Sequence, residues 1–237
     1  MLIRNCLIVL FFICSSAVVF AQQPDYVADV SNEQLLFVAN KGQIINEYGL
    51  PADDVLFALT NNGATIFVYR DGLSYQFTKY HTGELQNVNA FLFDLEKDFP
   101  LQEQIISTHR IDVKFVNANT QIEVIPESKS LIVENYFGVQ YGNGITNIPT
   151  FEKITCKNIY PNIDWVLYSK NGKLKYDLIL HPGANKNDIT FQITGTDEAH
   201  LVDATHMQIS SPLGKINDKG LFCFEKESAE TRNAAFI

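Results

Sequence analysis

The stretch from Ile163 to Leu180 constrains the fold of this chain more than any other. Two runs of strand-forming residues flank Asn171-Gly172, the kind of dipeptide that readily adopts positive φ at both central positions of a type I′ turn. If the lysines on either side of this dipeptide pair with each other, Trp165 lies opposite Leu178. The sequence therefore predicts a tight antiparallel β-hairpin with a defined register.

The two faces of this hairpin differ in polarity. One face is almost wholly apolar and consists of the pairs Leu167–Tyr176, Trp165–Leu178 and Ile163–Leu180. The other face is mixed and consists of the pairs Tyr168–Lys175, Val166–Asp177 and Asp164–Ile179. A strand pair with one apolar face packs on a core from that side, and a slip of one residue would exchange the faces of one strand. The pattern therefore specifies the pairing.

A second hairpin is predicted upstream. Ala64 to Arg70 and Leu73 to Lys79 alternate apolar and polar residues on either side of Asp71-Gly72, another dipeptide typical of primed turns. With Arg70 opposite Leu73, this register places Val68 opposite Tyr75 and Ile66 opposite Phe77, all on one face. Two hairpins with matching apolar faces predict an antiparallel sheet protein.

The rest of the chain supports the same fold class. Alternation predicts further strands, while residues 99–107 and 138–149 are predicted to be loops. The additional strand candidates are residues 35–38, 55–60, 90–95, 110–117, 121–125, 131–137, 189–193, 206–210 and 220–224. Since no stretch keeps a 3.6-residue apolar period over three turns, we expect an all-β fold. It should resemble a β-sandwich, with antiparallel sheets, long loops and little helix.

The first 21 residues have the pattern of a secretory signal peptide. Arg4 provides a positive start, Leu7 to Ile13 is a run of seven apolar residues, and Val19-Phe20-Ala21 ends in a small residue. The apolar run is shorter than the roughly 20 residues that span a bilayer. We therefore expect residues 1–21 to be removed and 22–237 to form one exported β domain with no membrane span. Two packed lobes, near 22–120 and 121–237, are the alternative division.

The composition and the cysteine content limit which partners and which redox states are compatible with the sequence. The formal net charge is −9 and no Lys/Arg cluster is present, which argues against nucleic-acid binding. Cys6 and Cys14 leave with the predicted signal peptide, so Cys156 and Cys223 remain. In an oxidising compartment they could form a disulfide, or they could be two buried thiols; both alternatives stay open.

Several stretches of the chain resemble the N-terminal domain of secreted bacterial proteins that carry seven-bladed β-propeller (SBBP) repeats. The matching positions are Phe37–Gln43, Arg110–Asn119, Asn135-Tyr136-Phe137, Ile148–Phe151, Tyr160–Asp164, Tyr176-Asp177 and Pro182-Gly183-Ala184. Such proteins often end in gliding-motility or type IX secretion tails. The resemblance implies an extracellular β domain at the cell surface, without catalytic residues that could be transferred to this chain.

The chain departs from the family pattern at two points. Asn162 stands where the family usually has glycine, a position that asparagine can fill at positive φ. The sequence also stops at Ile237 with neither propeller repeats nor a sorting tail. From this we expect the chain to be a truncated or split form of a longer product.

Candidate chemistry centres on the mixed face of the first hairpin. Asp164 and Asp177 share that face two pairs apart, so they could serve glycoside hydrolysis or bind calcium, although a structural ion pair is the simpler interpretation. Trp165, Tyr168 and Tyr176 could form a sugar-binding platform, with Tyr168 the best placed for exposure and core packing favoured for the other two. The loop from Gly138 to Asn147 is the predicted binding edge.

No other catalytic or metal-binding pattern is present. The five histidines (His81, His109, His181, His200 and His206) lack metal-ligand spacing, and there is no Gly-x-Ser-x-Gly nucleophile motif. We therefore assign no catalytic, cofactor-binding or metal-binding residues. The expected function is a non-catalytic extracellular domain for surface assembly, adhesion or scaffolding, with other extracellular domains or surface polysaccharide as partners. A carbohydrate-binding module, or a glycoside hydrolase that uses Asp164 and Asp177, is the alternative.

Overall fold

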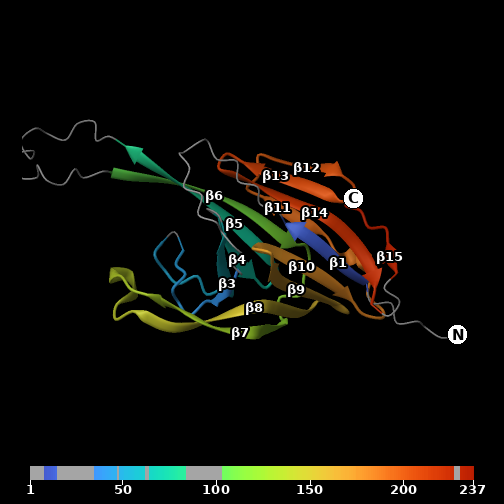
Figure 1. Cartoon of the computed structure of the whole chain (residues 1–237), viewed down its shortest axis with the longest axis horizontal. Coiled ribbons are helices and arrows are strands. Elements are labelled where there is room, and N and C mark those ends of the chain that lie inside the picture. Colours follow the sequence, from blue (N-terminus) through green and yellow to red (C-terminus); the bar gives the residue numbers. More distant parts are fainter. Residues whose placement is uncertain (1–7, 15–34, 47, 62–63, 84–102, 227–229) are drawn as a thin grey trace, which may run out of the picture.

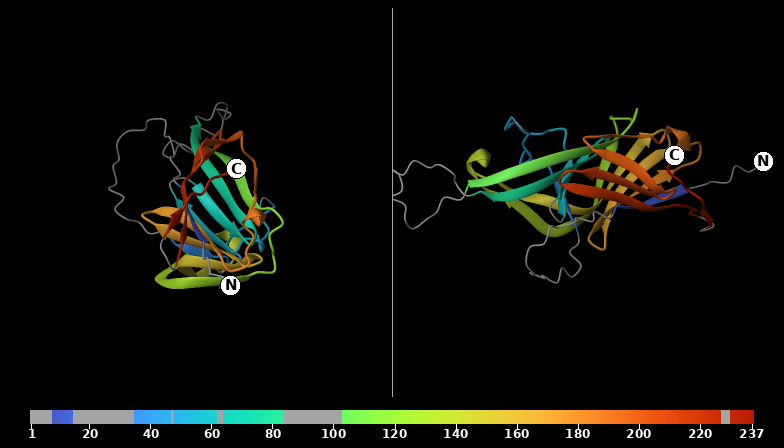
Figure 2. Two further views of the ribbon diagram at one scale, coloured as in Figure 1. Left: turned by 90° about the vertical axis from the view of Figure 1, so that its right-hand side faces the viewer. Right: turned by 90° about the horizontal axis from the view of Figure 1, so that it is seen from above.

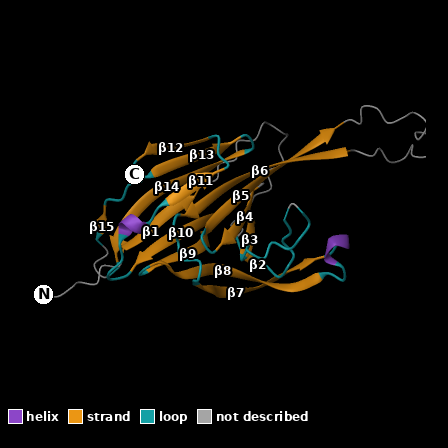
Figure 3. Cartoon of the chain, turned by 180° about the vertical axis from the view of Figure 1, so that it is seen from behind, coloured by secondary structure: helices purple, strands orange, loops and turns teal. Residues whose placement is uncertain are grey.

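The computed structural model describes residues 8–14, 35–46, 48–61, 64–83, 103–226 and 230–237. Almost all regular structure in these residues is β-strand (Figures 1 and 3), with two short 3-10 helices, η1 (Val139–Tyr141) and η2 (Lys186–Asp188). The strands are β1 (Ile8–Cys14), β2 (Phe37–Ala39), β3 (Phe57–Asn61), β4 (Ala64–Tyr69), β5 (Gly72–Gly83), β6 (Glu103–Phe115), β7 (Glu123–Tyr136), β8 (Ile145–Tyr160), β9 (Ile163–Lys170), β10 (Lys173–Leu180), β11 (Phe191–Thr194), β12 (Glu198–Asp203), β13 (His206–Ser211), β14 (Gly214–Glu225) and β15 (Thr231–Arg232).

The strands form one 15-stranded sheet whose main path runs β11-β6-β5-β4-β3-β2-β8-β9-β10-β1-β14-β13-β12. Strand β7 pairs with β8 outside this path, and β15 pairs with β14. The first and last strands of the path, β11 and β12, are neighbours in the chain, so the sheet curls until its two ends meet at Gly195 to Asp197. Figure 2 shows this curl along the long axis. The prediction of an antiparallel, all-β fold with little helix is confirmed.

The curled sheet encloses one apolar core. A continuous cluster of buried side chains includes residues from Phe37 to Leu221, and Trp165 is the largest fully buried side chain. Opposite walls touch at Gly214, where a Cβ atom would lie 2.3 Å from the ring of Phe77. None of the helices in the described residues is long and apolar enough to span a membrane.

The central hairpin has the predicted register. Strands β9 and β10 pair Lys170 with Lys173 and Trp165 with Leu178, and the remaining pairs have the same register. The turn residues Asn171 and Gly172 have φ of 53° and 65°, as a type I′ turn requires. The prediction from the sequence is confirmed in full for this hairpin.

The register predicted for the second hairpin was wrong by two residues. Val68 pairs with Leu73 and Tyr69 with Gly72, so the turn consists of Arg70 and Asp71. Gly72 is instead the first residue of β5. A Cβ atom at this position would lie 2.3 Å from the carbonyl oxygen of Val113 on β6. The glycine therefore permits close packing of two backbones and does not form the turn. The apolar residues still share one face, because a shift of two residues preserves the pleat.

Two predicted loops also need correction. Residues 103–107 belong to β6, and the segment from Gly138 to Pro149 contains η1 and the first residues of β8. Strand β8 was not predicted, since a proline and two asparagines at positive φ (Asn147 at 60° and Asn158 at 53°) interrupt its alternation. The predicted strand at residues 90–95 lies outside the described residues.

Asn162 has a φ of 61°, in the left-handed region that asparagine can adopt. It is the second residue of the two-residue turn between β8 and β9, whose last pair is Tyr160–Ile163. Replacing Asn162 with valine should lower the free energy of unfolding by about 1–2 kcal/mol, because a β-branched residue resists positive φ. Asn162→Gly should be neutral or slightly stabilising. Urea denaturation would compare them, and equal costs would contradict this account of the turn.

Candidate functional site

Asp164 and Asp177 lie on the same outer face of the β9–β10 hairpin, as predicted. Asp164 pairs in register with Ile179, and Asp177 with Val166, so the two aspartates are diagonal neighbours on adjacent strands. Their environments differ, however, and each carboxyl group contacts different partners.

Asp164 is the centre of a small ion cluster. Its Oδ2 accepts hydrogen bonds from Lys157 Nζ at 2.7 Å and His181 Nε2 at 2.8 Å, while Oδ1 accepts one from the backbone N–H of Asn158 at 2.9 Å. Burial opposes ionisation of this carboxyl, but the hydrogen bonds outweigh it and hold the pKa of Asp164 below its ordinary value. A buried carboxylate with three donors ties β8, β9 and the end of β10 together, which is a structural role.

The carboxyl group of Asp177 accepts fewer hydrogen bonds than that of Asp164. It accepts one hydrogen bond from the hydroxyl of Tyr168 at 3.2 Å. Burial raises the pKa of Asp177 to about 6, against the opposing effects of Tyr168 and nearby lysines. The two aspartates therefore differ in proton affinity, with Asp164 ionised and Asp177 partly protonated near neutral pH.

A groove of about 320 Å³ lies beside Asp164 on the same face. It is lined by Ile125, Glu127, Lys153, Thr155, Lys157, Val166 and Ile179. At its rim, the Glu127 carboxylate accepts hydrogen bonds from the hydroxyl of Thr155 and from Nζ of Lys153, the latter at 3.1 Å. The hydrogen bond from Thr155 is the main cause that lowers the pKa of Glu127. Each lysine of the lining has a carboxylate partner, Glu127 for Lys153 and Asp164 for Lys157.

The aromatic platform considered from the sequence does not form on the surface. Trp165 and Tyr176 are 2% and 8% exposed, and Trp165 packs edge-on against Phe115 with ring centroids 5.1 Å apart. Tyr168 is half-buried on the outer face. The predicted core packing of Trp165 and Tyr176 is confirmed, which leaves Tyr168 alone on the mixed face.

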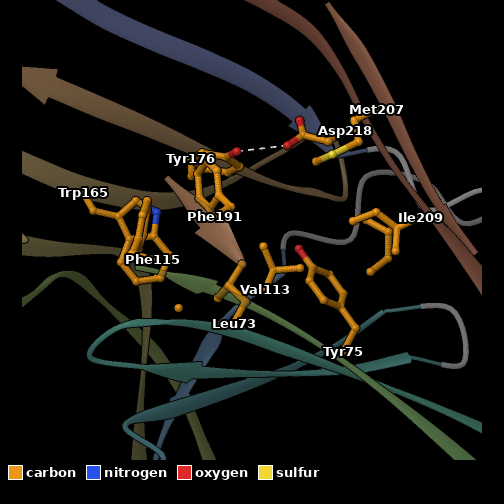
Figure 4. A pocket seen from close by; sticks show the side chains of 12 residues that line it. Leu73, Tyr75, Val113, Phe115, Trp165, Tyr176, Phe191, Met207, Ile209 and Asp218 are labelled. Atoms are coloured by element: carbon orange, nitrogen blue, oxygen red, sulfur yellow. Dashed lines mark hydrogen bonds between the residues drawn. The ribbon is translucent and has the colours of Figure 1, made fainter. Parts of the chain in front are cut away.

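An interior cavity lies next to Trp165 (Figure 4), and the sequence did not predict it. Its volume of about 30 Å³ is enough for one water molecule. Tyr176 donates a hydrogen bond at 2.9 Å to Oδ2 of Asp218 on β14. Among the described residues, Asp218 Oδ1 and Trp165 Nε1 have no hydrogen-bond partner. Each of these two atoms can bond water, and the cavity that both residues line has room for one water molecule.

Burial raises the pKa of Asp218 to about 7, although Tyr176 and Lys175 oppose this. An unfolded aspartate has a pKa of about 3.9, so between about pH 4 and pH 7 the folded state binds more protons than the unfolded state. The stability that Asp218 contributes is therefore complete below about pH 4 and declines as the pH rises to about 7, by at most about 1.4 kcal/mol per pH unit.

Asp218→Asn should remove this decline, because an amide keeps the shape of the protonated acid and does not titrate. Urea denaturation between pH 4.5 and pH 7.5 would measure it, with the difference between wild type and variant isolating Asp218 from other titrating groups. If both proteins lost stability equally over this range, Asp218 would not be protonated in the folded state.

Large apolar side chains are exposed on a two-stranded ribbon formed by β7 and the start of β8. We call residues Leu131–Val139 the distal arm. Leu131 and Val139 are about fully exposed, at 101% and 100%, and Phe137 is 72% exposed. Ile132 and Val133 are exposed as well, so both faces of the ribbon carry apolar groups. The ribbon extends away from the core at the end of the molecule opposite β15 (Figure 1).

The histidines have separate environments. Besides His181, which contacts Asp164, their partners are Ser107 for His81, Gly195 O for His109, Glu198 for His200 and Asn217 for His206. Within the described residues, no group of three His, Cys, Asp or Glu side chains is arranged to hold a metal ion.

The two cysteines of the predicted mature chain are not bonded to each other. Both are buried. Cys156 is on β8 and Cys223 is on β14, and β9, β10 and β1 separate these strands in the sheet. Burial raises the pKa of Cys156 to about 12, which makes it an inert thiol. Of the two alternatives left open by the sequence, buried thiols are the one observed.

Comparison with known proteins places the fold in a family. A family model described as "Domain of unknown function (DUF7948)" matches residues 37–236. The chain belongs to this family. No curated protein and no solved structure matches the chain.

The DUF7948 match includes most of the features described above. Asp164, Asp177, Asp218 and the distal arm all lie within residues 37–236. The match also includes every strand from β2 to β15, and it begins after β1. The family domain is therefore the curled sheet without its N-terminal strand.

Proposed function

We propose that this chain is a non-catalytic extracellular domain that contacts a partner protein through the distal arm, in surface assembly or adhesion. The observation that carries the proposal is the exposure of Leu131, Phe137 and Val139 at the end of a projecting ribbon. Contiguous exposed apolar residues are unusual on soluble proteins and typically mark interaction sites.

The chemistry of the distal arm favours a protein partner over a polysaccharide. Four of its five large exposed apolar residues are aliphatic (Leu131, Ile132, Val133 and Val139), whereas sugars stack on aromatic rings. The pairing of β7 with β8 is irregular between Lys129 and Tyr136, and such irregularities discourage simple strand addition at an edge. Contact through side chains with an apolar protein surface is the mode that fits.

The extracellular assignment rests on the sequence-based prediction of a signal peptide. Residues 1–21 have the composition of a signal peptide, and the chain resembles the N-terminal domain of SBBP-repeat surface proteins. The ion cluster supports a non-catalytic role, because all three donors around Asp164 hold its carboxylate in a structural contact.

The test compares binding of purified protein to intact cells of the organism that encodes it, measured by flow cytometry. Leu131→Ser combined with Val139→Ser should reduce binding by about tenfold or more, since a combined loss of about 1.4 kcal/mol of binding free energy is a tenfold change. The thermal midpoint should not change, since both side chains are about fully exposed. Val202→Ser, on β12 and 52% exposed, is the matched control and should bind normally.

Two results would contradict the proposal. Unchanged binding by the Leu131/Val139 double variant would show that the distal arm is not the contact. Competition by soluble surface polysaccharide, together with insensitivity to the arm substitutions, would favour a carbohydrate-binding module instead.

A further inference from the structure

Strand β1 lies between β10 and β14, and in the described residues it alone joins those two strands in the sheet. It pairs with β10 from Ile8–Leu180 to Ile13–Lys175. On its other side it pairs with β14 from Ile8–Glu225 to Cys14–Asp218, with one irregularity. Both neighbours therefore form hydrogen-bonded ladders along most of its length.

The position of β1 in the sheet contrasts with its position in the sequence. The family match begins at residue 37, so β10 and β14 belong to the shared domain and β1 does not. Residues 8–14 also lie inside the predicted signal peptide. If residues 1–21 are removed on export, the strand leaves and its two neighbours lose their pairing.

Closing the resulting gap by direct contact of its two walls would require a parallel ladder between β10 and β14. Strands β10 and β14 are each antiparallel to β1, so they are parallel to each other and about 10 Å apart, two strand spacings. Direct pairing would create a parallel ladder in a sheet where all recorded pairs are antiparallel. Unpaired backbone groups at two central strands are costly and favour another strand.

The structure also limits where a replacement strand could come from. Each described strand from β2 to β15 already has a place in the sheet, so within the described residues no strand is left over. A strand from another polypeptide satisfies the ladders on both sides, as in strand-addition complexes, where the main chain gives affinity and alternate side chains give specificity.

We propose that the position between β10 and β14 is an acceptor site for a donor strand from another protein. The donor is an extended segment of about seven residues, the length of β1, that runs antiparallel to both walls. It is apolar at alternate positions, those in register with the buried residues Tyr176, Leu178 and Leu180. This proposal rests on the proposed function in one respect, the removal of the leader on export.

The experiment starts from the full chain. A site for a sequence-specific protease is placed between Ala21 and Gln22, and the protein is cut after it has folded. A fluorescent peptide with the sequence of Ile8–Cys14, with Cys14→Ser and two lysines at each end, is then added. We expect one peptide to bind per cut protein, to displace residues 1–21 and to restore the thermal midpoint of the uncut chain. The uncut chain should not bind it.

A control peptide with Leu10→Asp and Phe12→Asp should bind about tenfold more weakly or not at all, because it places carboxylates in register with the buried residues Leu178 and Tyr176. Hydrogen exchange identifies the location of binding. Amides of β10 and β14 should exchange faster after loss of residues 1–21 and be protected again by the peptide.

Two results would overturn the acceptor site. In one, β10 and β14 stay protected after residues 1–21 have gone, and no peptide binds. In the other, the cut protein unfolds and peptide present during cutting does not prevent it. Either result leaves the distal arm and its cell-binding test unaffected, since those variants change neither β10 nor β14.

Discussion

Replacing Trp165 with alanine is expected to lower the free energy of unfolding by about 3–5 kcal/mol, the usual cost of deleting a large buried aromatic side chain. Trp165 is 2% exposed and packs against Phe115 in the centre of the core. Total stabilities of about 5–15 kcal/mol are typical, so much of the variant could unfold at physiological temperature. Urea denaturation monitored by circular dichroism would measure the loss.

Two other substitutions make this a test of the hairpin faces. Trp165→Phe should cost less than Trp165→Ala, because the indole N–H has no partner among the described residues and its removal breaks no bond with them. Tyr168→Ala, on the half-buried outer face, should cost about 1–2 kcal/mol for one hydrogen bond and partial burial. If Tyr168→Ala were the most damaging of the three, the assignment of the two faces would be reversed.

Replacing Asp164 with alanine is expected to cost about 2–4 kcal/mol. The substitution removes the acceptor for Lys157, His181 and the Asn158 N–H together, and hydrogen bonds to charged groups contribute about 1.5–3 kcal/mol each. The side chains of Lys157 and His181 are 39% and 41% exposed, so water compensates part of the loss. The cost should therefore stay below the sum of three such bonds.

Asp177→Asn is the matched control on the same face. It should cost much less than Asp164→Asn, because burial already favours the protonated form of Asp177. The pH dependence should differ as well. The pKa of Asp164 is lowered in the folded state, so its stabilisation is complete above the unfolded pKa of about 3.9 and is lost as the pH falls below that value. Equal costs for the two asparagine variants at pH 7 would contradict the structural role of Asp164.

The central hairpin could be predicted because its information is local. An Asn-Gly turn and a period-two apolar pattern determine both the register and the face of each residue. At the second hairpin the same reasoning failed, since Gly72 lies against the backbone of β6 and the sequence does not show which strand will approach it. A glycine can supply a positive φ in a turn or permit close packing of two backbones. The sequence alone does not show which of the two applies.

The candidate site could be predicted only in part. Asp164 and Asp177 were identified because they share a hairpin, but the sequence did not reveal the donors that make their environments different. Asp218 was missed entirely, since it meets Tyr176 across β1, from a strand 42 positions away in sequence. The place of β1 was also unpredictable, because an apolar run before a small-residue motif is compatible both with a leader and with a strand of the sheet.

The most direct test of the account is position-specific photo-crosslinking on intact cells. A photoreactive phenylalanine analogue is introduced at Phe137 in the distal arm or at Lys186 in η2, which lies at the opposite end of the molecule (Figure 3). The account predicts a discrete protein adduct from position 137 that disappears when Leu131→Ser and Val139→Ser are added, and no adduct from position 186. Adducts of equal yield from both positions, or none from position 137 on cells that bind the protein, would contradict it.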